Sequence, residues 1–181
     1  MNWGFVTSAS EPGVTAAQEL ADLFDAGGFP PPMVAPMRME RDEVCYGQAP
    51  VAMQMFAEGD GSYLHKTRFG LSAMGLAMGA ATVVGNQARK ARAAREAAAQ
   101  WRPCGQGVVY ITDRRLTIRE QQEWNNVWYR DVMTSTCDGS AIEIQRTGLP
   151  GLRLTLPQVH YYFVLFYRFA FDQVTRPPAA F

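Results

Sequence analysis

The feature that most constrains the fold is a succession of short apolar segments between residues 107 and 156. Each is rich in β-branched and aromatic residues and is followed by a turn signal such as Asp113, residues 137–140 (CDGS) or residues 148–151 (GLPG). Apolar and polar side chains alternate in residues 142–145 (IEIQ), which is typical of a strand with one face in water. The pattern therefore predicts antiparallel strands at residues 107–112, 115–120, 124–129, 132–137, 141–147 and 151–156.

Segments on both sides of this region complete a predicted α+β domain at residues 37–181. Residues 42–56 are expected to form a further strand, in which Pro50 must lie at an edge or a bulge. Residues 157–175 keep helical spacing after Pro157, and proline is favoured in the first turn of a helix. The sheet is thus expected to be followed by one closing helix.

The first 36 residues are expected to form a helix on a stiff tether. Residues 12–26 place Val14, Ala17, Leu20 and Phe24 on one stripe, which predicts an amphipathic helix. Two glycines follow, and residues 29–36 contain three consecutive prolines that exclude another helix. Residues 1–36 are therefore assigned as an N-terminal helix and a proline-rich linker.

The segment between the first two predicted strands has a different composition. Residues 69–85 carry no charged side chain, and the residues after them are alanine-rich with basic side chains, which favours a helix. We expect a helical insertion at residues 66–102, ended by Pro103 and packed on the protein. Its uncharged run would span about 25 Å as a helix, less than the ~30 Å hydrocarbon core of a bilayer. Shallow membrane association and a homo-oligomer contact are the alternatives.

The strand region is similar to a known family. Residues 107–118 (GVVYITDRRLTI) resemble the G-x-x-x-x-T-x-x-R-L hairpin of bacterial PH-like and GRAM-like domains, and residues 123–132 (EWNNVWYRDV) lie where those domains have a W-x-x-V/I strand. The resemblance covers residues 42–175. It implies a PH-like bent antiparallel β-roll of about seven strands, capped by the C-terminal helix, which binds through an open sheet edge or the loops at one end. The helical insertion departs from the simplest members.

The charged turn inside that hairpin has two interpretations. Thr112 and Asp113 can accept backbone N–H bonds across a tight turn, and strand alternation sends Arg114 and Arg115 to opposite faces. We favour a structural turn in which one arginine pairs with an acid, for which Asp131 and Glu120 are the candidates. The alternative is a ligand-binding site for phosphate or carboxylate, because the arginine fork suits both groups.

Two further patches are candidate binding surfaces. A cationic stripe in the insertion would suit anionic lipid, although a solvated helix face is the simpler interpretation. The closing helix is apolar nearly all round, so it is covered either by the chain's own helices, which we favour, or by a partner. The residues of the two patches are Arg89, Lys90, Arg92 and Arg95 for the stripe, and Tyr161, Tyr162, Leu165 and Phe169 for the partner patch.

Nothing in the sequence predicts catalysis. The three cysteines are far apart, no spacing places a histidine beside one of them, and no glycine-rich phosphate loop or serine elbow is present. We therefore expect no enzyme, no metal and no cofactor, and the unpaired cysteines favour a cytoplasmic protein, with membrane association as an alternative. The 17 basic and 17 acidic side chains cancel, which argues against nucleic acid as a partner.

The expected function is a non-catalytic binding or scaffolding module, with a protein segment as the favoured ligand. One alternative is a peripheral membrane module that binds anionic lipid through residues 66–95. The other is an enzyme whose site the sequence does not reveal. A homo-oligomer is compatible with each of these hypotheses.

Overall fold

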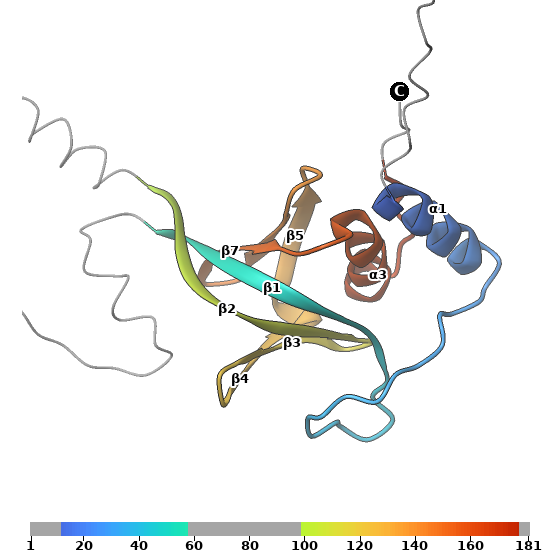
Figure 1. The fold of residues 1–181 in the computed structure, drawn as a ribbon, viewed down its shortest axis with the longest axis horizontal. Coiled ribbons are helices and arrows are strands. Elements are labelled where there is room, and N and C mark those ends of the chain that lie inside the picture. The colour runs from blue at the N-terminus through green and yellow to red at the C-terminus, as the bar shows by residue number, and fades with distance from the viewer. Residues whose placement is uncertain (1–11, 58–98, 178–181) are drawn as a thin grey trace, which may run out of the picture.

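The computed structural model of the protein describes residues 12–57 and 99–177 (Figure 1). These residues form an α+β fold in which a helix precedes a sheet of antiparallel strands and a second helix follows it. The elements are α1 (Pro12–Asp25), β1 (Cys45–Ala57), β2 (Gln100–Thr112), β3 (Arg115–Glu120), β4 (Glu123–Trp128), the short 3-10 helix η2 (Tyr129–Asp131), β5 (Val132–Cys137), β6 (Ile142–Arg146), β7 (Leu149–Thr155) and α3 (Val159–Phe171).

The seven strands of the described residues form one open sheet in the order β4-β3-β2-β1-β7-β6-β5. Strand β1 lies at the centre, because its whole length pairs with β2 and its Ala52–Met55 part also pairs with β7. Residues of β3 and β4 and residues of β6 and β7 line one hollow from opposite sides, so the sheet bends across β1. Strands β4 and β5 are its two edges. The predicted strand count and the closing helix are confirmed, and the strand limits differ from the prediction by a few residues except at β2.

Strand β2 begins at Gln100, so residues 100–102 are a strand and not the end of a helix as the sequence suggested. Ala57 pairs with Gln100, and the ring of Phe56 meets that of Trp101 at 5.3 Å. Such cross-strand aromatic pairs stabilise strands and outweigh the helix propensity of the preceding alanines. The rest of the predicted insertion, residues 66–98, lies outside the described residues. In the described part of the chain, no helix is both long and apolar enough to cross a bilayer.

Two of the strand prolines, Pro50 and Pro103, lie where their strand has one partner or its register shifts. Pro50 pairs with Val108 of β2 but precedes the part of β1 that pairs with β7, as the sequence required. Pro103 lies beside the register shift between Met53 and Gln54, beyond the part of β2 that pairs with β3. Proline is tolerated at such edges and bulges, so Pro103 does not end the strand.

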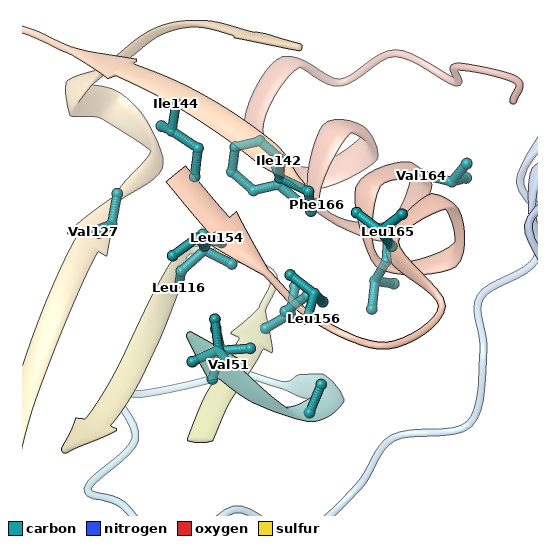
Figure 2. Packing of buried hydrophobic residues seen from close by; sticks show 14 of the residues in the cluster. Val51, Leu116, Val127, Ile142, Ile144, Leu154, Leu156, Val164, Leu165 and Phe166 are labelled. Atoms are coloured by element: carbon teal, nitrogen blue, oxygen red, sulfur yellow. The ribbon is translucent and has the colours of Figure 1, made fainter. Parts of the chain in front are cut away.

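The core lies between the bent sheet and α3 (Figure 2). Strand alternation directs one face of each strand inward, and Phe166 of α3 is fully buried against this interior. Its ring meets that of Tyr129 at 5.6 Å, which fixes η2 to the helix. Helix α3 thus closes one end of the roll. Further fully buried members are Ile111, Leu116, Ile118, Ile144 and Leu154.

Helix α1 packs on the outer side of α3 (Figure 1). The stripe predicted from the sequence is buried, and Phe24 meets Phe169 edge-to-face at 6.2 Å. Near the C-terminal end of the described chain, Arg176 forms ion pairs with Asp22 at 2.7 Å and Asp25 at 2.5 Å. The apolar outer face of α3 is therefore covered by the chain's own N-terminal helix, which is the alternative that the sequence favoured.

Candidate functional site

Strand β5 is an open edge of the sheet and the central part of the candidate site. Its only partner among the described strands is β6, so one side of its backbone is unpaired. Thr134 and Thr136 are exposed, and Met133 lies at a register shift with 62% of its surface exposed. Ser135 faces the opposite way and is half-buried. An exposed edge of this kind can pair with another extended chain.

Helix α3 lies beside β5 and supplies aromatic side chains. His160 contacts the end of β5, where its Nδ1 lies 3.9 Å from Cys137 Sγ. Helical spacing places Phe163, Tyr167 and Phe171 on the same side as His160. Neighbouring ring centroids in this row are 5.4 Å and 4.6 Å apart.

Tyr167 differs from its two neighbours in the row. Phe163 and Phe171 also pack against the hydrophobic core, whereas Tyr167 lies half-buried between their rings. The Tyr167 ring is thus held in place by two aromatic contacts, and the residue remains partly exposed. A tyrosine placed in this way offers both apolar area and a hydrogen-bonding group to a ligand. We call β5 and the row Phe163, Tyr167 and Phe171 the β5–α3 edge.

The Cys137–His160 pair is not arranged as a nucleophile and base. Burial raises the pKa of the Cys137 thiol, and the nearby Asp138 carboxylate acts in the same direction. The thiol is therefore protonated at neutral pH, whereas nucleophilic cysteines have a lowered pKa. The Asp138 carboxylate does not orient His160, because it accepts bonds from Ser140 and Ala141 and pairs with Arg153. Sequence spacing gave no sign of this contact, since 23 residues separate the two side chains.

The charged turn between β2 and β3 is structural, as the sequence favoured. Thr112 Oγ1 accepts the backbone N–H groups of Arg114 (3.1 Å) and Arg115 (3.0 Å), and Asp113 Oδ1 accepts that of Val44 at 3.0 Å. Tyr129 adds a hydrogen bond to the Thr112 carbonyl at 2.7 Å. The turn is therefore held from both sides.

The acids that pair with the two arginines are not the predicted ones. Arg115 is buried and binds Glu43 through Nε and a terminal nitrogen, each at 2.8 Å, and its guanidinium also lies 4.7 Å from the centre of the Trp128 ring. Arg114 is exposed and lies 3.5 Å from Glu40. Asp131 and Glu120, the predicted partners, are not used. The reason is that residues 40–43 pass over the hairpin, a contact across 72 residues that local spacing cannot reveal.

Glu43 was missed by the sequence reasoning, and its ionisation follows from its surroundings. Burial alone would raise the pKa of its carboxyl group. Hydrogen bonds from the Glu40 amide, the Thr112 hydroxyl and the Arg115 guanidinium outweigh burial and hold the pKa below its ordinary value. Arg115 is thus fully engaged within the protein and does not present its fork to a ligand.

The predicted partner patch on α3 requires a correction. Leu165 is completely buried, and Phe169 stacks on Tyr46 at 4.9 Å and on Phe29 at 6.2 Å. Phe24 of α1 and Phe29 of the linker cover Phe169, and Leu165 is buried beside Gly47 of β1, so the two residues do not form an uncovered face. Tyr161 and Tyr162 are half-buried, and the Tyr162 hydroxyl donates to the Gln48 carbonyl at 2.7 Å.

The predicted cationic stripe, Arg89, Lys90, Arg92 and Arg95, lies outside the described residues. Figure 1 shows that the end of the ribbon at which β1 ends and β2 begins lies away from α1 and α3. Within residues 12–57 and 99–177, no three histidine, cysteine or acidic side chains gather as metal ligands.

Comparisons with known proteins give no family. No family model matches the chain, and no curated protein matches it. Among solved structures, the C-terminal domain of an unknown protein from Leishmania infantum is similar, with 17% sequence identity and a TM-score of 0.33. The match covers 36% of this chain and 69% of that chain. A likeness at this level carries no argument about this protein.

Proposed function

We propose that the protein is a non-catalytic binding module of PH-like fold that takes an extended protein segment along the β5–α3 edge. The observation that carries the proposal is the unpaired side of β5 beside the aromatic row on α3. The strand order and the helix at one end of the bent sheet support the PH-like assignment.

The chemistry of the edge favours a polypeptide as the ligand. An added strand would satisfy the free N–H and C=O groups of β5 through main-chain hydrogen bonds, which supply affinity without a sequence requirement. Alternate side chains of that strand would point toward α3. The row around Tyr167 offers them aromatic surface, so we expect aromatic or aliphatic residues at every second position of the ligand.

A random peptide library displayed on phage tests the proposal, followed by chemical-shift mapping of the selected peptides. We expect amide shifts concentrated in residues 132–137 and in α3. Tyr167→Ala should weaken binding about tenfold or more, as expected for an aromatic anchor at an interface. Trp124→Ala is the matched control on the other edge strand, β4, and should leave the affinity unchanged.

Two outcomes would overturn the proposal. Selected peptides could shift β4 or the loops while β5 remains unaffected, which would place binding elsewhere. Alternatively, the library could yield no binder while the chain pellets with anionic vesicles and a chain lacking residues 69–95 does not. The lipid-binding alternative would then replace the protein-segment ligand.

A further inference from the structure

The first helix begins beside one end of the β5–α3 edge. Gly13 of α1 lies against the start of α3, where an added Cβ would be 3.1 Å from the Gln158 Cα. Gly13 also lines a hollow together with Gly139 of the β5–β6 turn and His160 of α3. Since His160 contacts Cys137, the chain enters α1 at the Cys137 end of β5 (Figure 1).

The aromatic row on α3 extends along β5 from this end. Helix α3 starts near Cys137, and its Phe166 meets Tyr129 of η2, which immediately precedes β5. The helix therefore runs from the Cys137 end of β5 toward the Val132 end. The three side chains of the row follow one another in this direction at intervals of about 6 Å, because four residues of an α-helix rise about 6 Å.

Residues 1–11, which lie outside the described residues, lead into α1 and contain a short apolar segment. Trp3 and Phe5 are two positions apart, so in an extended strand both point to the same side at a separation of about 6.6 Å. That separation is close to the interval of the aromatic row. The segment is residues 2–7 (NWGFVT), six residues like β5, and its strand-favouring members are Trp3, Phe5, Val6 and Thr7.

The connection to α1 decides how this segment can lie on β5. Thr7 and Pro12 are separated by five Cα–Cα steps, which an extended chain covers with about 18 Å at most. A strand parallel to β5 places Thr7 at the Cys137 end, beside the start of α1. An antiparallel strand places Thr7 at the Val132 end, so the connection would have to span the length of β5, about 17 Å, in addition to the gap to α1. The parallel arrangement is the one within reach.

We propose that residues 2–7 of the chain itself occupy the β5–α3 edge as a parallel strand, with Trp3 and Phe5 against the aromatic row. The inference rests on the proposed function, because it uses the same edge and the same apolar residues at every second position. Main-chain groups of the segment would bond the free side of β5, and the two rings would cover Tyr167. The protein's own segment thus competes with an outside ligand.

Attachment to α1 makes even a weakly binding segment an effective competitor. A short connection holds a ligand at an effective concentration of about 1 mM. A segment with an intrinsic Kd of about 0.1 mM would then fill roughly nine-tenths of the edges. An outside peptide would bind about tenfold more weakly than it binds a free edge.

A photoreactive phenylalanine analogue at position 5 of the full chain tests where the segment lies. Peptide mass mapping after irradiation should find cross-links to residues 132–137 or to α3, and Tyr167→Ala should reduce their yield. An equal mixture of isotope-labelled and unlabelled chains identifies the occupant. Cross-links within one isotope support the proposal. Mixed-isotope cross-links would assign the edge to a second copy, and cross-links confined to other elements would place the segment elsewhere, so either result would overturn it.

A second measurement compares the affinity of outside peptides for the wild type and for the double variant Trp3→Ala/Phe5→Ala. The peptides are selected from the library against the double variant, in which the edge should be free. They should bind this variant about tenfold more tightly than the wild type. Val6→Ala is the matched control, because strand alternation directs Val6 away from α3, and it should bind like the wild type. A urea titration of each variant establishes that the fold is retained.

The two measurements separate a failure of this inference from a failure of the proposed function. If the peptides bind β5 with equal affinity in the wild type and the double variant, the intramolecular occupant is wrong and the proposed function stands. If neither chain binds a peptide while the cross-link within one chain forms, the occupant is supported. The edge then serves only the chain's own segment, and the proposed function is wrong.

Discussion

Replacing Arg115 by methionine tests whether the buried ion pair holds the linker on the β2–β3 hairpin. The side chains of Arg115 and Glu43 are only 9% and 0% exposed and share two hydrogen bonds of 2.8 Å. Arg115→Met leaves the Glu43 carboxylate buried without its counter-charge. Breaking a buried pair in this way costs about 3–5 kcal/mol of unfolding free energy. With a urea dependence of about 2 kcal/mol per molar, the unfolding midpoint should fall by roughly 2 M.

The assay is urea unfolding followed by circular dichroism and by tryptophan fluorescence. The matched control is Arg114→Ala, which removes the neighbouring ion pair with Glu40, whose side chains are 40% and 50% exposed. Exposed pairs contribute at most about 1 kcal/mol, so this variant should unfold close to the wild type. Equal and small effects of the two substitutions would refute the reasoning that burial makes the Arg115 pair strong.

Three further predictions concern the same fold. The pKa of Glu43 is lower in the folded protein than its unfolded value near 4.5. Its ionised carboxylate therefore stabilises the fold fully above the unfolded pKa, and this stabilisation is lost as the pH falls through the folded pKa. The difference in urea midpoint between wild type and Glu43→Gln should accordingly shrink as the pH falls below about 4.5. Phe24→Ala should cost about 3–5 kcal/mol and increase amide exchange in α1, since this buried ring joins α1 to α3; unchanged exchange would contradict that packing. Gly107→Ala should destabilise by about 1–3 kcal/mol, because the added Cβ meets the Arg119 carbonyl, and a midpoint within error of the wild type would show that the strands can separate there.

Local patterns were sufficient for most of the strands and helices that the structure describes. Alternation in residues 142–145 and the oxygens of Thr112 and Asp113 indicated strands and a turn that the structure contains. The stripe along residues 12–25 likewise indicated which face of α1 is buried. These features depend on neighbours within a few residues, which the sequence displays directly.

Features that depend on distant residues could not be predicted. Glu43 reaches Arg115 across 72 residues, and His160 reaches Cys137 across 23. The start of β2 was misassigned because helix propensity in the alanine-rich segment gives no hint of the pairing between Phe56 and Trp101. In each case the deciding contact joins residues that are far apart in the sequence.

The cross-strand pair of Ala57 and Gln100 has a consequence for how this protein can change. These two residues are neighbours in the sheet, so the two ends of the segment that connects them are held close together. The entropic cost of closing a loop rises only slowly with its length. The connecting segment can therefore be lengthened, shortened or replaced with little change in the stability of the sheet. This point is therefore where new partners could be acquired without rebuilding the domain.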